Sequence, residues 1–279
     1  IIGNFGKEAE RDLISIAESL GAKGTIHYQD DPLGTAHAIM CAKDALKGKV
    51  IVAFADTLFR ADFTIEDDKD GMIWVSRIDD PKMFGVVKVN DAGIITDFIE
   101  KPQTFVSDLA IIGIYYFKDG ENLRKELQFL LDNDIREKGE YQLTNALENM
   151  KQKGIRFVPG KVDEWLDCGN KDATVFTNQR VLENHRSDNM IAKTVKLDNS
   201  VIISPCYIGE LVELKNSVVG PHVSIGMHSK IENTVLSNSI IQTHTKIKNS
   251  VIHNSMLGHF VDYNNIPESI SISDYSTHS

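Results

Sequence analysis

Apolar and polar positions follow one pattern up to about residue 190 and a different one after it. In the first part, short apolar runs alternate with stretches of helical periodicity. We expect strands at residues 26–28, 50–55, 72–77, 86–89, 94–100 and 110–117, and helices at residues 7–20, 35–46, 120–132 and 141–153. The run 50–55 is continuously apolar, which is typical of a strand buried on both faces. The alternation predicts an α/β domain, Rossmann-like, with a mainly parallel sheet.

The second part is repetitive. An asparagine and a small hydroxyl residue precede an apolar pair that begins with valine four times, at Asn199, Asn216, Asn233 and Asn249, which are 17, 17 and 16 residues apart. Such a period predicts one structural coil stacked on the next. The coils resemble those of the left-handed parallel β-helix with hexapeptide repeats. We therefore expect two domains, residues 1–188 and residues 189–279.

Composition excludes several classes of protein. The 279 residues are 42% hydrophobic and 25% charged, as in ordinary globular proteins, and the net charge is −10. An acidic chain argues against binding to nucleic acid or to an anionic membrane, and no apolar run reaches the roughly 18 residues of a membrane span. Cys41, Cys168 and Cys206 show neither a disulfide framework nor a zinc pattern, which favours reduced thiols in a cytoplasmic protein.

Two aspartates are candidate metal ligands. Asp56 follows the apolar strand at residues 50–55 and should emerge at its carboxyl end, where parallel sheets bind ligands. Asp167 lies in the turn Trp165-Leu166-Asp167-Cys168-Gly169. Their oxygens could hold Mg²⁺. The alternatives are a turn or cap residue at Asp56 and a surface turn at Asp167.

A glutamine and glycine loop precedes the predicted helix at residues 35–46. In Gln29-Asp30-Asp31-Pro32-Leu33-Gly34-Thr35, the Gln29 amide offers both a donor and an acceptor to the edge of a base. Gly34 would let the backbone approach the ring closely. The alternative is a loop in which Thr35 caps the helix with its hydroxyl, and both interpretations can hold together.

A charged pair ends the alternating strand at residues 94–100. Glu100 could accept hydrogen bonds from sugar hydroxyls, and Lys101 could pair with a phosphate as a compact charge. An exposed ion pair at a strand end is the commoner meaning of such a dipeptide.

Taken in order, these segments resemble the sugar-1-phosphate nucleotidylyltransferases. The resemblance covers residues 1–172 and a β-helix that several branches carry. It implies Mg²⁺ ligands at Asp56 and Asp167, with Lys101 also in the catalytic set. It further implies nucleotide binding by Gln29, Gly34 and Thr35, and sugar-phosphate binding by Gly85, Glu100, Lys101 and Gly113.

Several positions depart from the family pattern. Cys168 stands where a Thr is common, Phe84 replaces a Tyr, and Asn145 replaces an Asp in a step, residues 140–145, that we interpret as mostly structural. The chain begins with Ile1, and nothing in residues 1–20 resembles the glycine-rich phosphate loop with which the family opens. We expect residues to be missing upstream, and catalysis to be severely impaired without them.

The predicted reaction is attack of the sugar-phosphate oxygen on the α-phosphorus, with release of pyrophosphate. Glucose 1-phosphate and dTTP are the first choice of substrates, and UTP- or GTP-dependent enzymes remain open. A hexapeptide-repeat acyltransferase is an alternative, because His222, His228, His244 and His253 lie in the repeats. A non-catalytic binding protein is another. We also expect a homo-oligomer formed through the β-helix.

Overall fold

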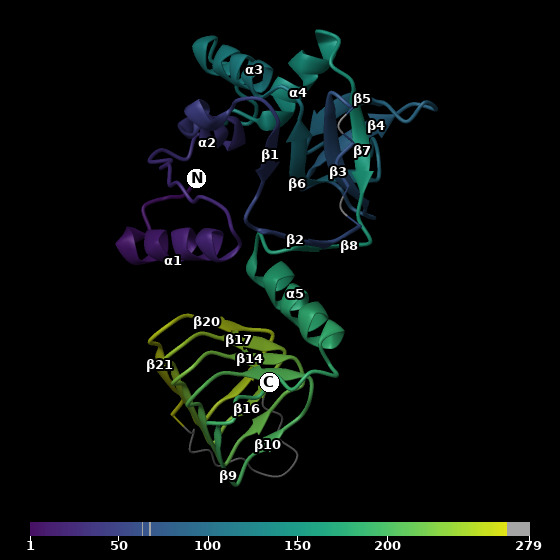
Figure 1. The fold of residues 1–279 in the computed structure, drawn as a ribbon. Coiled ribbons are helices and arrows are strands. Elements are labelled where there is room, and N and C mark those ends of the chain that lie inside the picture. The colour runs from purple at the N-terminus through teal and green to yellow at the C-terminus, as the bar shows by residue number, and fades with distance from the viewer. Residues whose placement is uncertain (63, 67, 267–279) are drawn as a thin grey trace. The chain divides into compact units, whose positions relative to one another are not determined.

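The computed structural model describes residues 1–62, 64–66 and 68–266 (Figure 1). The chain divides into two compact units, Ile1–Trp165 and Leu166–Ser279. The predicted boundary lies later, after residue 188. The difference arises because helix α5 (Lys171–Asn184) packs on the coils of the second unit, as described below.

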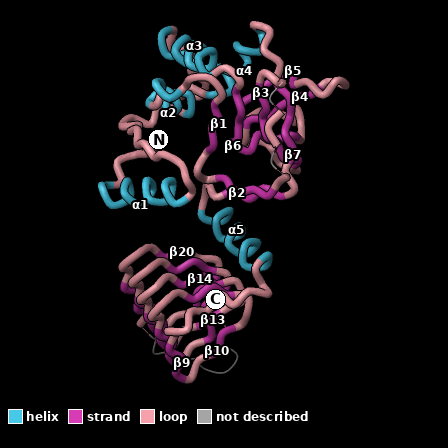
Figure 2. The backbone as a smooth tube through the Cα atoms, in the orientation of Figure 1, coloured by secondary structure: helices cyan, strands magenta, loops and turns pink. Residues whose placement is uncertain are grey.

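The first unit is built around one mixed sheet with the strand order β5-β4-β6-β3-β7, in which β1 also pairs with β6. The strands are β1 (Val50–Ala53), β3 (Gly71–Arg77), β4 (Gly85–Val89), β5 (Ile95–Glu100), β6 (Leu109–Phe117) and β7 (Phe157–Lys161). Strands β2 (Thr57–Arg60) and β8 (Glu164–Asp167) form a separate two-stranded sheet (Figure 2).

The α/β character is confirmed, but the sheet is more antiparallel than expected. Only β3 and β7 pair in parallel among the described strand pairs of this sheet; β1–β6, β3–β6, β4–β5 and β4–β6 are antiparallel. The short turn at Asn90–Gly93 explains the direction of β4 and β5. A connection this short can join two strands only as antiparallel neighbours. Asn90 shapes this turn by accepting N–H bonds from Ala92 and Ile94 through Oδ1.

The sheet buries side chains on both faces. Along β6, Ile111, Tyr115 and Phe117 join one apolar cluster, while Ile112, Ile114 and Tyr116 join another. The first cluster lies under α2 (Thr35–Cys41), α3 (Gly120–Asp132) and α4 (Leu143–Gln152), as the positions of Ala36, Leu127 and Leu147 in it show. The alternation along β6 explains why its sequence is apolar throughout.

Strand β1 does not meet the expectation of burial on both faces. Ile51 is 50% exposed, and exposed and half-buried residues alternate along the strand. Its described ladder partner is β6 alone. Helix α1 (Gly6–Ser19) is also poorly covered, with no buried residue, and the helix predicted at residues 35–46 divides into α2 and a short 3₁₀ turn, Lys43–Ala45.

The second unit is a parallel β-solenoid of about four coils, as predicted, with three sheets. One sheet holds β10 (Val201–Ile202), β13 (Val218–Val219), β16 (Val235–Ser237) and β19 (Val251–His253). The second holds β11 (Cys206–Ile208), β14 (Val223–Ile225), β17 (Ser239–Ile241) and β20 (Met256–Leu257). The third holds β9 (Lys196–Asp198), β12 (Glu213–Lys215), β15 (Lys230–Glu232), β18 (Lys246–Lys248) and β21 (Asp262–Asn264). The left hand of the coils stays a prediction.

The repeated asparagine and hydroxyl residue each have a structural task. Asn216 and Asn233 adopt a left-handed backbone at φ 48° and 50°, which asparagine tolerates better than most residues. Their side chains form a ladder, with Asn216 Nδ2 donating to Asn233 Oδ1 at 3.2 Å. The following hydroxyl, Ser217 Oγ, accepts the backbone N–H of Thr234 in the next coil at 3.1 Å. The repeat therefore fixes one corner of every coil.

Helix α5 is held to the coils by polar contacts. His222 Nε2 lies 2.6 Å from Glu183 Oε1, and Ser224 Oγ donates to Asn178 Oδ1 at 2.6 Å. Hydrogen bonding to His222 lowers the pKa of Glu183 below its ordinary value.

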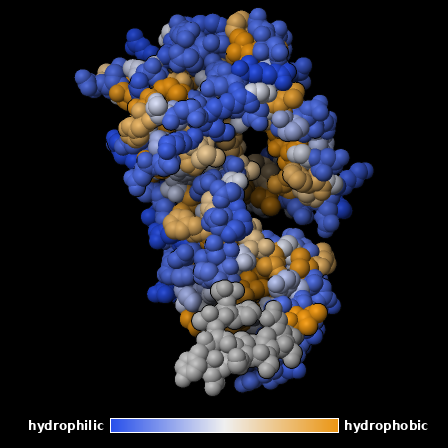
Figure 3. All heavy atoms as spheres, turned by 180° about the vertical axis from the view of Figure 1, so that it is seen from behind, coloured by the Kyte–Doolittle hydropathy of each residue, from blue (hydrophilic) through white to orange (hydrophobic). Residues whose placement is uncertain are grey.

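On the face seen in Figure 3, hydrophilic residues dominate and apolar residues gather in patches. No helix in the described part of the chain has the length and apolar character to cross a membrane.

Candidate active site

The loop around Gln29 is fastened to the start of α4. Leu33 O accepts the N–H of Tyr141 at 2.8 Å, and Ala36 N donates to Tyr141 O at 2.9 Å. A Cβ on Gly34, where φ is +111°, would lie 2.6 Å from Tyr141 O, so this position requires glycine whether or not a ligand is bound. Gln29 Nε2 donates to Gly34 O at 3.1 Å, which engages the amide nitrogen and leaves the carbonyl oxygen for a ligand.

Thr35 lies at the first residue of α2, but its hydroxyl serves a different helix from the one expected. Its Oγ1 accepts the N–H of Leu143, the first residue of α4, at 3.0 Å. Gly34 is the N-cap of α2, without a side-chain hydrogen bond. The prediction that Thr35 caps α2 is therefore wrong. Its hydroxyl caps α4, because the loop packs against the start of α4 just before α2 begins. The prediction that Thr35 binds nucleotide stays a prediction.

Asp56 lies in a tight turn that is tied to a bulge in β6. Phe54 N donates to Gly113 O at 2.9 Å, and Thr57 Oγ1 donates to Ile112 O at 2.7 Å. Gly113 has φ +85°, and the β3–β6 register shifts in this region. The bulge thus holds both ends of the turn, while Asp56 itself is exposed.

Asp167 ends β8 and belongs to the second unit. Its Oδ1 accepts the N–H of Gly169 at 3.1 Å, and its backbone oxygen accepts the Thr177 hydroxyl at 2.7 Å. The glycine contact orients the carboxylate. Within the described residues no group of three or more His, Cys, Asp or Glu side chains could hold a metal ion. Each aspartate by itself presents oxygen ligands of the kind that a hard divalent cation prefers.

Glu100 is the most enclosed of the predicted site residues that carry a charge. Its side chain is 10% exposed, and Oε2 accepts the Thr144 hydroxyl at 3.1 Å. Burial raises the pKa of this carboxyl, while the Thr144 bond and the Lys101 charge oppose the shift. Gly85 is its partner in the β4–β5 ladder. A Cβ on Gly85 would lie 3.1 Å from Glu100 Oε2, so a larger residue would displace the carboxylate.

Lys101 follows Glu100 in a left-handed backbone conformation, with φ 42°. Its Nζ lies 3.8 Å from Glu100 Oε1, and its side chain is 41% exposed. Phe84 O accepts its N–H at 3.1 Å, and Lys138 Nζ donates to its carbonyl at 2.9 Å. These two hydrogen bonds to the Lys101 backbone fix a turn that leaves the ammonium group accessible. Phe84 itself packs edge-on against Trp165, with ring centroids 4.9 Å apart.

Two residues near the site escaped the sequence reasoning. Thr144 lies in the step that we interpret as structural, yet its hydroxyl contacts Glu100. Tyr115 is buried on β6, and burial, with the charges of Glu100 and Asp56, raises the pKa of its phenol far above the ordinary value. One indication of Tyr115 lay in the sequence. Its phenol hydroxyl lies in a largely apolar strand, two residues after Gly113.

The histidines of the coils have structural partners. His228 stacks on His244 and His244 on Phe260, each pair with centroids 4.8 Å apart. His253 Nδ1 lies 3.0 Å from Ser237 Oγ, and His222 contacts Glu183. These contacts account for the histidines without an acyl-transfer role.

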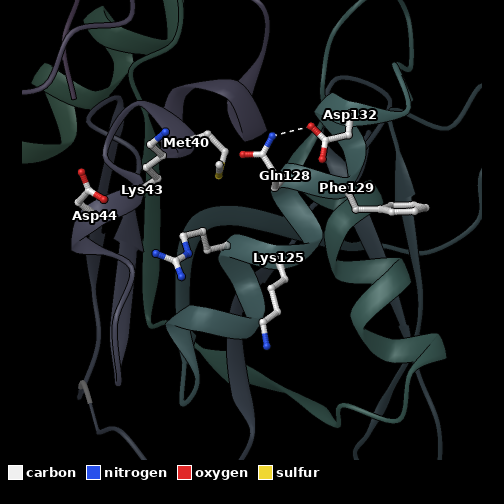
Figure 4. Close-up of a pocket in the computed structure, with 8 residues that line it drawn as sticks. Met40, Lys43, Asp44, Lys125, Gln128, Phe129 and Asp132 are labelled. Atoms are coloured by element: carbon white, nitrogen blue, oxygen red, sulfur yellow. Dashed lines mark hydrogen bonds between the residues drawn. The ribbon is translucent and has the colours of Figure 1, made fainter.

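A surface groove of about 460 Å³ lies between α2 and α3, apart from the predicted site residues. Figure 4 shows the side chains that line it, among them Lys43, Lys125, Gln128 and Asp132, with Gln128 donating to Asp132 at 2.7 Å. Its mixed charges are typical of a solvated surface.

A family comparison bears directly on this arrangement. The family described as nucleotidyl transferase matches residues 1–184, which hold all the predicted site residues. The chain belongs to the nucleotidyl transferase family. The enzyme class that the motifs predict, a sugar-phosphate nucleotidyltransferase, is confirmed at this level, whereas the individual site residues stay predictions.

Individual relatives agree with the assignment. This nucleotidyl transferase is 27% identical over 265 residues to the low-salt glycan biosynthesis nucleotidyltransferase Agl11 of Haloferax volcanii, which covers 86% of this chain and 73% of that protein. It is 26% identical over 264 residues to a glucose-1-phosphate thymidylyltransferase of Streptomyces antibioticus, with 86% and 72% covered. The solved nucleoside-diphosphate-sugar pyrophosphorylase of Vibrio cholerae RC9, 22% identical with a TM-score of 0.53, covers 63% of this chain and 78% of that chain and supports the fold.

Proposed function

We propose that this nucleotidyl transferase joins glucose 1-phosphate to dTTP and releases pyrophosphate. The observation that carries the proposal is that β6 supports both halves of the predicted site. Its Ile112–Gly113 carbonyls hold the turn of Asp56. Its Ile111 side chain lies 3.4 Å from the Cβ position of Gly85, beside Glu100. A metal-binding carboxylate and a sugar-binding carboxylate supported by one strand suit a transfer between two phosphorylated substrates.

The roles follow from charge and geometry. Glu100, oriented by Thr144, accepts hydrogen bonds from sugar hydroxyls, and the backbone at Gly85 and Gly113 faces the hexose. Lys101 places a positive charge beside the sugar phosphate, so that its oxygen is aligned for attack on the α-phosphorus. Phosphoryl-type transfer depends mainly on such positioning and charge stabilisation.

Asp56 and Asp167 would hold Mg²⁺ in this proposal, because both present oxygen ligands of the kind that the ion prefers. When bound, the ion would neutralise charge on the triphosphate. The divalent metal is a general feature of the family, whereas the identity of the ion is part of the proposal.

The base preference rests on Gln29 and on the relatives. With its amide nitrogen engaged by Gly34, Gln29 offers an acceptor oxygen, which pairs with the ring N–H that thymine, uracil and guanine present. Cytosine and adenine lack that donor. A relative named as a thymidylyltransferase favours dTTP among the three, while UTP and GTP remain the alternatives.

A substrate panel tests the proposal. Pyrophosphate release is measured for the protein with its natural N-terminus, with Mg²⁺, glucose 1-phosphate and each of dTTP, UTP, GTP, ATP and CTP. We expect release with dTTP, and at most about 1% of that rate with CTP or ATP. The same panel with mannose and N-acetylglucosamine 1-phosphates tests the sugar. Faster release with another sugar would replace glucose, and no release with any pair would contradict the proposal.

The homo-oligomer and the cytoplasmic location remain predictions.

A further inference from the structure

The turn that carries Asp167 is fastened to α5 by two hydroxyl groups. Thr177 Oγ1 donates to the backbone oxygen of Asp167 at 2.7 Å, and Thr174 Oγ1 donates to that of Cys168 at 3.1 Å. The two threonines are three residues apart, so they lie on the same side of the helix. Thr177 is 3% exposed, and water therefore does not compete for its bond. The backbone of the turn is thus held by α5.

Helix α5 is in turn fastened to the coils along its length. Near its start, Asp172 Oδ1 accepts the side-chain N–H of Asn254 at 3.0 Å. In its middle, Asn178 Oδ1 accepts the Ser224 hydroxyl at 2.6 Å. The Glu183 contact described above holds its last turn. These three contacts span about 16 Å of helix, so α5 cannot slide or tilt on the coils without breaking at least one of them.

The contacts to the turn and the contacts to the coils meet in one turn of α5. Thr177 and Asn178 are consecutive residues, and the first bonds to the Asp167 turn while the second bonds to Ser224 on β14. The N–H of Gly169 completes the arrangement by donating to Asp167 Oδ1 at 3.1 Å. A continuous path therefore leads from the coils through α5 to the carboxylate of Asp167.

We propose that Thr177, held in place by the Asn178–Ser224 hydrogen bond, is a positioning residue for the carboxylate of Asp167. The inference rests on the proposed function in that it takes Asp167 as a ligand of the divalent ion. A carboxylate already held in one orientation loses little conformational freedom when it binds a cation. Partners behind a metal ligand commonly change metal affinity by about 10- to 100-fold. The coils thus contribute to the site without supplying a ligand.

Hydrogen exchange of the Gly169 amide in the metal-free full chain tests the positioning without relying on catalysis. Thr177→Val keeps the branched shape of the side chain and removes only the hydroxyl. We expect at least about tenfold faster exchange at Gly169, because the turn loses its bond to α5. Thr177→Ser restores a hydroxyl and should exchange close to the unmodified rate. Unchanged exchange in Thr177→Val would overturn the proposal.

A pair of serine variants tests the contribution of the coils. Ser224→Ala removes the donor to Asn178, and we expect about threefold faster exchange at Gly169, since the effect passes through α5. Ser237→Ala is the matched control. It removes a hydroxyl on β16 that lies 3.0 Å from His253 Nδ1, and it should leave Gly169 unaffected. Equal exchange in the two variants would overturn the role of Ser224.

A Mg²⁺ titration of pyrophosphate release connects the positioning to the ion. Thr177→Val should raise the half-saturating Mg²⁺ concentration about tenfold, with a change of less than about twofold in the rate at saturating Mg²⁺. A purely structural role would lower the melting temperature and leave the Mg²⁺ dependence unaltered, which would overturn the proposal. An unaltered Mg²⁺ dependence in Asp167→Asn would instead contradict the proposed function, and the Gly169 exchange rates would still decide whether Thr177 positions the turn.

Discussion

The two units stabilise their strands by contacts of different range. In the β-helix, Val218 pairs with Val235 and Val235 with Val251, one coil further along the chain. In the first unit, Val50 pairs with Phe117 and Gly71 with Phe157. Short-range pairing costs little loop-closure entropy and repeats with the sequence. The long-range pairing places the end of β1, which Asp56 follows, against β6, and all the predicted site residues except Asp167 lie in this less regular unit.

Two glycines test the comparison with the largest expected effects. At Gly220, φ is +108° and a Cβ would lie 2.0 Å from Ile203 O in the preceding coil. Gly220→Ala should destabilise the β-helix by about 4 kcal/mol or more. Gly34→Ala should instead displace the Gln29 loop and lower pyrophosphate release at least about tenfold. Thermal unfolding and pyrophosphate release, measured on both variants, test these two predictions. A Gly220→Ala protein with unchanged thermal stability would contradict this account.

Shortening a buried side chain in one unit should destabilise that unit and leave the other unaffected, with the next largest effect. Ile231 is 1% exposed in a central coil, and Leu127 is 0% exposed in α3. Each change to alanine should cost about 2–5 kcal/mol. Hydrogen exchange should show faster opening of the coils in Ile231→Ala and of the sheet and helices in Leu127→Ala. Loss of protection throughout both units in either variant would mean that they do not unfold separately.

The asparagine ladder allows a finer test. Asn233→Ala removes two ladder bonds and places alanine at φ 50°, and we expect a loss of about 1–2 kcal/mol in the free energy of unfolding. Asn233→Gly keeps the backbone relaxed and should cost less. The difference between the two variants in denaturant measures the backbone contribution; equal losses would assign the whole effect to the side-chain bonds.

Glu100 gives the smallest effect, and it depends on pH. Its folded pKa is raised, mainly by burial, above the ordinary value of 4.5. The protonated form is therefore favoured by folding, and the associated stability is present below pH 4.5 and lost as the pH rises through the folded pKa. Glu100→Gln removes this dependence, so its stability relative to the unmodified chain should increase as the pH rises from 4.5. Denaturant titrations at several pH values check this, and a relative stability that falls with pH would contradict it.

Much of the fold could be predicted from local pattern. The repeat of an asparagine and a hydroxyl residue predicted the coils. In the structure the asparagine forms the side-chain ladder, and the hydroxyl accepts a backbone hydrogen bond from the next coil. The predicted strands at residues 72–77, 86–89 and 110–117 match β3, β4 and β6 within one residue. Whether the strands pair in parallel or antiparallel was harder to predict, because the sequence of a strand does not show which strand it pairs with. Strand β1 showed the same limit, since an apolar run alone does not reveal that Ile51 is exposed.

Motif order named the candidate site residues, but it did not give their contacts. It indicated Asp56, Glu100 and Gly113 as site residues, and their roles stay predictions. The Thr144 bond to Glu100 joins α4 to β5 across 44 residues, and Thr35 caps α4 rather than its own helix. Both depend on how distant elements pack, which no local spacing encodes.

The most direct measurement of the central claim is pyrophosphate release from dTTP and glucose 1-phosphate by the protein with its natural N-terminus, compared with Asp56→Asn and Asp167→Asn under a titration of Mg²⁺. This account predicts Mg²⁺-dependent release in the unmodified protein. In each folded variant it predicts a rate at least about 100-fold lower, because an amide replaces a charged ligand. Release that persists near the unmodified rate in both variants would contradict the assignment of the two aspartates and, with it, the proposed mechanism.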